Sequence, residues 1–198
     1  MKESGVDCES MIIREALETD AQQIAAVHAA NWRFFYRGAL RDEFLDGDIV
    51  SERSVFWVKQ LHSPRPNQHV IVAEKEDKIV GFACAYTNFD EQWGSLLDSL
   101  HVSQFMQRQG IGAKLLVAVA QHCKSDTASG GLFLWVVQSN LQAQRFYLAL
   151  GAVNAGADSW APPGGGYVPR YRFAWQSVSQ LLHNAATHSS RPHKGTVL

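Results

Sequence analysis

Apolar residues recur along the chain with two alternating periods, which predict strands and helices in turn. Runs with the composition of strands lie at residues 11–14, 69–74, 79–87, 95–102, 132–137, 152–159 and 171–175. Helical spacing marks the stretches that start near residues 19, 48, 111 and 139. The resulting order, β-α-α-β-β-β-α-β-α-β-β, predicts one domain of the α+β or α/β class.

Local signals place the ends of two of these helices. Thr19 with Gln22, and Ser139 with Gln142, have the spacing of a capping box, in which two side chains satisfy free amides at a helix start. Gly151 follows the last apolar residue of the fourth helix, where glycine commonly ends a helix. We therefore expect the first and fourth helices to begin at these boxes.

The two ends of the chain lack this periodicity. Residues 1–10 are polar and patternless, and residues 183–198 mix Ser, Thr, His, Pro and Gly. Neither stretch has enough apolar surface to offset the entropy lost on ordering. We predict a flexible N-terminal extension at 1–10, a single domain at 11–182 and a flexible C-terminal tail at 183–198.

Composition narrows the classes of function. The 198 residues include 18 Lys and Arg against 19 Asp and Glu, so the chain has no broad basic field for nucleic acid or anionic lipid. The longest apolar run, Leu132–Val137, is far shorter than the ~20 residues of a membrane span, and the N-terminus lacks the apolar region of a signal peptide. We expect a soluble, cytoplasmic protein with neither a nucleic-acid nor a membrane partner.

Cysteine and histidine do not form a metal-binding pattern in the sequence. Cys8, Cys84 and Cys123 have no C-x-x-C spacing, and the eight His have no paired spacing inside a predicted element. We therefore expect neither a disulfide framework nor a metal site.

One segment has the pattern of an anion-binding turn. Gln107–Lys114 joins a predicted strand to a predicted helix and contains Gly110 and Gly112. Such a turn presents unpaired amides and the positive end of the helix dipole to a phosphate, although turns also use glycine for steric reasons alone. Leu115 stands where a dinucleotide fingerprint needs Gly or Ala, and the Lys-Ser or Lys-Thr pair of a P-loop is missing from this segment. Both of those phosphate-binding motifs are therefore excluded.

Two motifs in this order resemble the GCN5-related N-acetyltransferase (GNAT) superfamily. The segment 107–112, Gln-Arg-Gln-Gly-Ile-Gly, matches its pyrophosphate motif Gln/Arg-x-x-Gly-x-Gly/Ala, and residues 140–151 are similar to its Asn-x-x-Ala-x-x-Phe-Tyr-x-x-x-Gly pattern. The resemblance implies an α+β (three-layer α/β) fold, with helices on both faces of a mixed, mostly antiparallel sheet. Its fourth and fifth strands would splay apart, and acetyl-CoA would bind in the splay.

The resemblance also implies which residues bind acetyl-CoA, without a metal. The amides of Gln109 to Ala113 would hold the pyrophosphate, and Asn140 would bind the pantetheine arm while also capping a helix. Of the nearby basic residues Arg108, Lys114 and Arg145, we expect one or two to meet the phosphates. The implied cofactor residues are Leu100, His101, Val102, Gln107, Arg108, Gln109, Gly110, Ile111, Gly112, Ala113, Asn140, Ala143, Arg145 and Phe146.

Two catalytic residues are predicted, each with an alternative. By the resemblance, Tyr147 would protonate the leaving thiolate; a core aromatic is the competing interpretation. Asp98 lies two residues before Leu100, which strand alternation places on the same face, so its carboxylate is the candidate base. A structural hydrogen bond is an equal expectation for Asp98, and Glu91 or a water chain could replace it as base. The amide of Leu100 or Val102 would polarise the acetyl carbonyl.

Aromatic residues are predicted at the acceptor end. Trp32, Tyr36 and Trp160 are the candidate substrate-binding residues, although half of the rings in such a cluster are expected to be packing. The resulting hypothesis is direct acetyl transfer, in a ternary complex, to a primary amine of a small molecule or peptide. A non-catalytic acyl-CoA-binding module is the alternative. Exposed strand edges would also allow a homodimer.

Overall fold

A computed structural model describes residues 11–126, 130–163 and 166–189. The strands are β1 (Ile12–Glu15), β2 (Gln68–Lys75), β3 (Lys78–Asp90), β4 (Gly94–Val102), β5 (Leu132–Val137), β6 (Val153–Trp160) and β7 (Val168–Trp175). The α-helices are α1 (Ala21–Phe35), α2 (Asp42–Asp46), α3 (Ile49–His62), α4 (Ile111–Asp126), α5 (Leu141–Ala149) and α6 (Val178–Ser189). Two 3-10 turns, η1 (Glu18–Asp20) and η2 (Gln104–Met106), complete the described elements.

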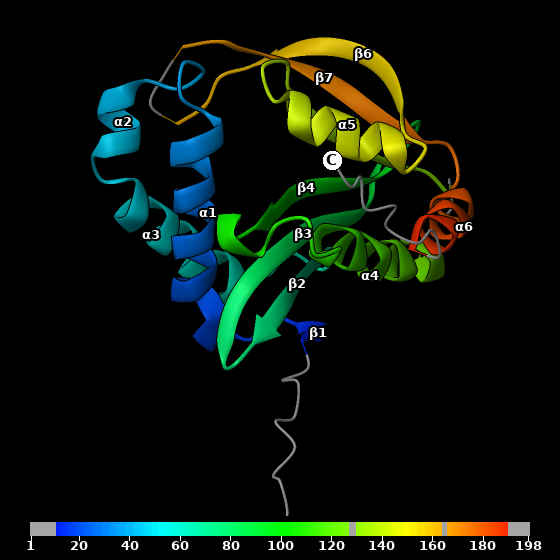
Figure 1. Cartoon of the computed structure of the whole chain (residues 1–198), viewed down its shortest axis with the longest axis horizontal. Helices are drawn as coiled ribbons and strands as arrows, with labels where there is room; N and C mark the ends of the chain where they lie inside the picture. The colour runs from blue at the N-terminus through cyan, green and yellow to red at the C-terminus, as the bar shows by residue number, and fades with distance from the viewer. Residues whose placement is uncertain (1–10, 127–129, 164–165, 190–198) are drawn as a thin grey trace, which may run out of the picture.

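The seven strands form one sheet in the order β1-β2-β3-β4-β5-β7-β6. Every neighbouring pair is antiparallel except β4 and β5, which are parallel. That parallel pairing covers only Ser95–Leu97 against Leu132–Leu134, and β5 then continues beside β7. In Figure 1, β6, β7 and α5 lie on one side of the resulting gap, with β2 to β4 and α4 on the other. The predicted mixed sheet with splayed β4 and β5 is confirmed.

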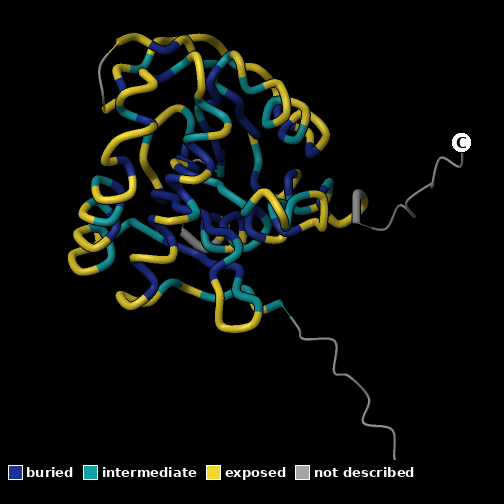
Figure 2. Tube along the Cα trace, turned by 60° about the vertical axis from the view of Figure 1, so that its left-hand side comes forward, coloured by how far each residue is buried: buried dark blue, intermediate teal, exposed yellow. Residues whose placement is uncertain are grey.

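The sheet separates two hydrophobic cores, because successive strand residues face opposite sides. In β3, Ala83 packs with the core beneath α4, α5 and α6, whereas Phe82 packs with the core beneath α1 and α3. Figure 2 shows the buried segments running along the strands between more exposed helices. Helices therefore cover both faces, as predicted.

Both predicted capping boxes are wrong in detail. The N-cap residue of α1 is Asp20, whose carboxylate accepts hydrogen bonds from the Leu17 amide (2.8 Å) and from Arg14 (2.7 and 3.0 Å). Arg14 also pairs with Glu74, so Asp20 joins β1 and β2 to the start of α1. At α5 the cap is Asn140, which accepts the Ala143 amide at 3.0 Å.

The C-terminal boundary is also different from the prediction. The expected flexible tail at 183–198 is wrong as far as Ser189, because α6 continues to that residue. Leu181 and Ala185 lie four residues apart on one side of α6 and are buried against the α4 core. The remaining tail and the N-terminal extension, 1–10, lie outside the described residues. Within the described chain, every helix is too short or too polar to cross a membrane.

Replacing Leu181 with alanine should therefore destabilise the whole domain. The side chain is fully buried, so its loss should lower the free energy of unfolding by about 2–5 kcal/mol. Urea unfolding followed by circular dichroism measures this change. The neighbouring exposed Gln180 is the control, and Gln180→Ala should change stability by less than about 0.5 kcal/mol. Equal stabilities for the two variants would mean that α6 does not belong to the core.

Candidate functional site

A cleft of about 1120 Å³ opens where β4 and β5 separate. It runs from the turn before α4, past the start of α5, to the end of α1. The cleft lining contains the predicted residues Tyr36, Asp98, Leu100, His101, Val102, Gln107, Arg108, Gln109, Gly110, Ile111, Gly112, Ala113, Asn140, Ala143, Phe146 and Tyr147. The structure thus brings the strand end, the glycine turn and the second motif to one site.

The glycine turn has the backbone geometry of an anion site. Arg108 (φ 62°) and Gly110 (φ 77°) both adopt left-handed conformations, and α4 begins at the next residue. Alternating handedness of this kind turns successive amides toward a common point. The Lys114 amide already donates to the Gly110 carbonyl at 3.0 Å. The amides before it, from Gln109 to Ala113, are those that a helix start leaves for a ligand.

Side chains fix this turn against its neighbours. Gln107 donates from Nε2 to the Val102 carbonyl at 3.2 Å and accepts from Gln142 Nε2 at 3.1 Å. The turn is thereby tied to the end of β4 and to the start of α5. Asn140, which caps α5, borders the cleft beside it. The expected double role of Asn140 is thus confirmed for the cap, and its cofactor role stays a prediction.

The basic residues divide between the cleft and the surface. Arg108 and Lys114 line the cleft near the amide turn, where they would add positive charge. Arg145 is exposed on α5 and does not line the cleft, and its contact with the cofactor stays a prediction. On α5, Ala143, Phe146 and Tyr147 face the cleft instead, and Arg145 points away from that stripe.

A β-bulge decides where Asp98 lies. Cys84 pairs with Ser99 and Ala85 pairs with Leu97, which leaves Asp98 as an extra residue in β4. A bulge breaks the two-residue alternation of a strand. Leu100 consequently packs against the α4 core, whereas the Asp98 carboxyl interacts electrostatically with Tyr36, which follows α1, and with Arg53 of α3. The prediction that Asp98 and Leu100 share a face is therefore wrong, although both border the cleft.

The environment of Asp98 makes its carboxyl easier to protonate than usual. Solvent in the open cleft reaches the residue, but the surrounding protein leaves its carboxyl poorly hydrated. Burial therefore raises the pKa of Asp98 above its ordinary value of 3.8, while the Ser99 hydroxyl at 3.1 Å and two arginines, Arg53 and Arg65, oppose the rise. Among the described residues that line the cleft, Asp98 is the only carboxylate. Glu91 lies in the exposed β3–β4 turn, away from the cleft lining.

Two phenols face the same region. Tyr147 is buried, and its ring contacts Phe146, Phe173 and Trp175 at centroid distances of 5.1–6.4 Å. Burial raises the pKa of Tyr147 well above its ordinary value, with a further rise from nearby Tyr36. Burial likewise raises the pKa of Tyr36 to about 12. Both phenols therefore keep their protons at neutral pH. The core and cleft interpretations of Tyr147 hold together, since its ring packs inward while the residue borders the cleft.

The other predicted substrate residues pack behind Tyr36. Trp32 is only 5% exposed, stacks on Tyr36 at 5.6 Å and meets Trp160 edge-on at 5.8 Å. The role of the two tryptophans in substrate binding stays a prediction, but neither of them lines the cleft. The reason is that Trp32 lies on the inward side of α1, in a small core shared with α2 and the β6–β7 pair. The cluster holds Tyr36 in place and does not form the pocket itself.

Asn31 and Ser99, which were not predicted as site residues, line the acceptor end of the cleft together with Phe35. Asn31 is buried on the same stripe of α1 as His28, so its polar side chain on an apolar stripe was the available signal. Phe35 lies one residue before Tyr36, and Ser99 follows the bulge residue. These positions depend on how α1 crosses β4, which local pattern does not specify.

Buried His28, half-buried His101 and a buried arginine also lie at this end of the cleft. The His101 ring stacks near His28 at 4.6 Å, and burial lowers the pKa of His101 to about 4. His28 accepts a hydrogen bond from Trp57 Nε1 at 2.9 Å. The buried Arg53 guanidinium lies 4.6 Å from the Trp32 ring, and it contributes to lowering both histidine pKa values. The His101 side chain therefore belongs to the packed floor, and its backbone remains the part predicted to meet the cofactor.

Two sequence relatives of this chain are named as N-acetyltransferases. The chain is 29% identical over 139 residues to a probable N-acetyltransferase of Mycobacterium tuberculosis, covering 68% of this chain and 75% of the relative. It is 30% identical over 131 residues to an uncharacterized N-acetyltransferase of Bacillus subtilis, covering 65% and 72%.

Solved structures share the fold. The PaiA N-acetyltransferase of Thermoplasma acidophilum, solved with coenzyme A, aligns with a TM-score of 0.62 at 17% identity, over 81% of this chain and 98% of that one. YncA of Salmonella typhimurium, solved with acetyl-CoA, aligns with a TM-score of 0.60 at 16% identity, over 84% and 94%. The family model described as "Acetyltransferase (GNAT) family" matches residues 17–152. Since this match spans more than half of the chain and includes the glycine turn and the second motif, the protein belongs to the GNAT family of acetyltransferases.

Proposed function

We propose that this protein transfers the acetyl group of acetyl-CoA to a primary amine of a small molecule or peptide, directly and within a ternary complex. One observation carries the proposal: a single cleft joins the amide turn at Gln109–Ala113 to the only carboxylate of its described lining, Asp98, and to Tyr147. Anion binding and proton transfer are the two capacities that such a reaction needs. Family membership supports the same reaction class.

The residues of the cleft fit the cofactor chemically. The amides of Gln109 to Ala113 would hold the pyrophosphate, with Arg108 and Lys114 supplying charge. A side chain at Gly112 would project into the junction of α4 and α5, where Phe146 and Val102 are its nearest neighbours. The Asn140 amide would face the pantetheine arm. When bound, acetyl-CoA supplies an activated acyl group.

Two residues of the chain would then transfer protons, one taken from the acceptor amine and one given to the departing thiolate. The acceptor amine must be neutral to attack, and the Asp98 carboxylate, which lines the cleft, would take its proton directly or through water. The departing thiolate needs a proton, and Tyr147 holds one because burial disfavours its ionised form. The amide of Leu100 or Val102, at the open edge of β4, would polarise the carbonyl.

The acceptor end favours an amine next to an apolar or aromatic group. Phe35 and Tyr36 offer ring surface, and Asn31 offers an amide. Asp98 contributes negative charge that would attract a protonated amine before it loses its proton. These features support a small amine or an exposed peptide amine as the acceptor.

A ligand titration followed by a transfer assay tests the proposal. Acetyl-CoA and CoA should each raise the melting temperature, whereas NADH should not, because only a ligand that binds the native state stabilises it. A panel of primary amines, assayed by thiol release, should then identify an acceptor. CoA binding without transfer to any amine would favour the non-catalytic module, and no melting shift would exclude the cofactor site.

Replacing Asp98 with asparagine should remove the acidic limb of the pH–rate profile. Burial raises the pKa of Asp98, so its carboxylate forms only at a pH above the range in which ordinary carboxyl groups ionise. The value of kcat/KM should therefore rise with pH only above that range. Asp98→Asn should lower kcat/KM about 100-fold near neutral pH and abolish that limb. Glu91→Gln is the matched control, and it should leave the profile unchanged. If the pH–rate profile of Asp98→Asn still shows the acidic limb of the wild type, the proton of the acceptor amine passes to water instead.

A further inference from the structure

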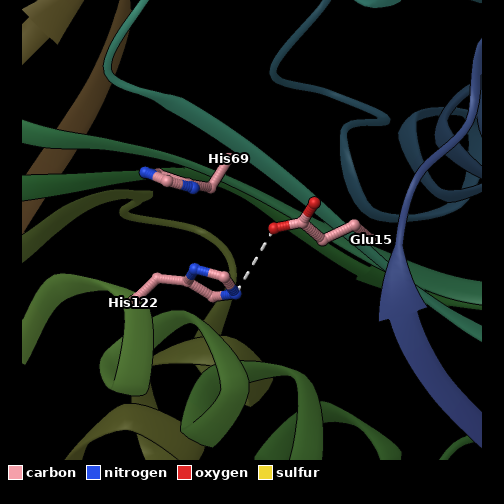
Figure 3. A group of neighbouring side chains, drawn as sticks. All are labelled: Glu15, His69 and His122. Carbon is pink, nitrogen blue, oxygen red and sulfur yellow. Dashed lines mark ion pairs between the residues drawn. The ribbon is translucent and has the colours of Figure 1, made fainter. Parts of the chain in front are cut away.

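We propose that Glu15, His69 and His122 form a binding site for a divalent transition metal of the zinc type. Their ligand atoms all lie within 4.8 Å of one another. The His122 Nε2 atom is 3.8 Å from Glu15 Oε1, and the two imidazole rings are 4.9 Å apart at an angle of 32°. Figure 3 shows the His122 ring extending toward the Glu15 carboxylate, with the His69 ring lying over the His122 ring.

Three elements far apart in sequence create this cluster. Glu15 pairs with Ile71 in the β1–β2 register, and His69 lies two residues before Ile71 on β2. Strand alternation therefore places both side chains on the face that α4 covers, where Ile71 enters the core. His122 approaches from the C-terminal half of α4. A chain-order pattern could not reveal the site, since it contains no closely spaced ligand pair.

The donor set decides the class of ligand. Two imidazole nitrogens and one carboxylate suit zinc and its neighbours, whereas magnesium and calcium prefer oxygen atoms alone. Ligand bonds of about 2.0–2.2 Å would place the donor atoms roughly 3.3 Å apart in a tetrahedral site. The donor atoms lie within 4.8 Å of one another, so rotation of the side chains would have to bring them closer around the metal. Glu15 is exposed and both histidines are half-buried, which leaves a fourth position for water.

The surrounding charges are compatible with a bound cation. Arg14 is adjacent in sequence, but its guanidinium pairs with Asp20 and Glu74. Lys114 is eight residues before His122, or about 12 Å along α4. The cluster is also separate from the acetyl-transfer cleft, because none of its three residues lines that cleft. A bound metal would tie the edge strand β1 and its neighbour β2 to α4.

Calorimetry with zinc tests the proposal on the full-length protein. Wild type should bind one zinc ion at this site and melt at a higher temperature when zinc is present. His122→Ala and Glu15→Gln should each weaken this binding at least about tenfold. Glu15 is exposed, so its variant folds even if the histidine variant does not. The matched control is His62→Ala, because exposed His62 contacts Glu18 at 3.5 Å in a single His–Glu pair. That variant should bind zinc like wild type.

Cobalt substitution identifies the ligands. A four-coordinate nitrogen and oxygen site should give visible absorption bands without the near-ultraviolet charge-transfer band of a thiolate, and His122→Ala should abolish these bands. The proposal would be overturned by wild-type zinc affinity in both cluster variants, by thiolate absorption, or by the absence of saturable binding to wild type. None of these readouts depends on acetyl transfer, so a failed acetyltransferase assay would leave this result unaffected.

Discussion

Replacing Gly112 with tryptophan should abolish acetyl-CoA binding while the protein stays folded. Gly112 lies in the first turn of α4, between the free amides and the α5 helix. An indole there would fill the space that a pyrophosphate needs. We expect the dissociation constant for CoA to rise more than about 100-fold, a loss of more than about 2.7 kcal/mol of binding free energy. Titration calorimetry measures this change directly.

The alanine variant at the same position separates blockage from backbone damage. A methyl group at Gly112 would lie 3.5 Å from Phe146 Cζ and 3.9 Å from Val102 Cγ2, which are ordinary contact distances. Gly112→Ala should therefore fold normally and bind CoA within a few-fold of wild type. Circular dichroism and melting without ligand show whether Gly112→Trp remains folded. Wild-type CoA affinity in a folded Gly112→Trp protein would refute the placement of the phosphate site.

The glycine turn could be predicted from sequence because the residues that form it are close together in the chain. A strand that ends at Val102, two glycines and an amphipathic helix that begins at Ile111 determine which amides are free. The second motif is similarly local, since Asn140 caps the helix that carries Tyr147. The splay between β4 and β5 was expected from the resemblance to the GNAT superfamily that these two segments carry, and each segment follows one of the two parallel strands.

Features that depend on pairing or packing across the sheet were harder to predict. The bulge at Asp98 depends on how β4 aligns with Cys84 and Ala85 of β3, and neither strand alone specifies it. Trp32 could not be assigned to core or cleft until its partner on β6 was known. Here two rings, Trp32 and Trp160, supply the packing and Tyr36 supplies the cleft surface.

The C-terminal helix shows a different limit. Its composition resembles that of a tail, because most of its side chains are polar or small. Only a narrow apolar side, including Leu181 and Ala185, meets α4. A helix of this kind gains its stability from tertiary packing more than from its own propensity. Composition therefore underestimates order where a long neighbouring helix offers a complementary surface.

Replacing Tyr147 with phenylalanine should lower kcat by about 100-fold, with little change in the affinity for CoA. The ring packs among Phe146, Phe173 and Trp175, and phenylalanine preserves those contacts. Only the hydroxyl is lost. Because burial raises the pKa of Tyr147, the hydroxyl is protonated throughout the neutral range, and the defect should be nearly constant with pH there. Steady-state kinetics and CoA calorimetry together measure the two effects.

A second tyrosine provides the control for removing a buried phenol. Burial also raises the pKa of Tyr86, but its hydroxyl donates to Gln60 at 3.4 Å, and the residue lies outside the cleft lining. Tyr86→Phe should therefore keep wild-type turnover. A loss of kcat confined to Tyr147→Phe identifies its hydroxyl as the proton donor to the departing thiolate. Wild-type turnover in Tyr147→Phe would instead assign this residue to the hydrophobic core alone, and the thiolate would then take its proton from water in the cleft.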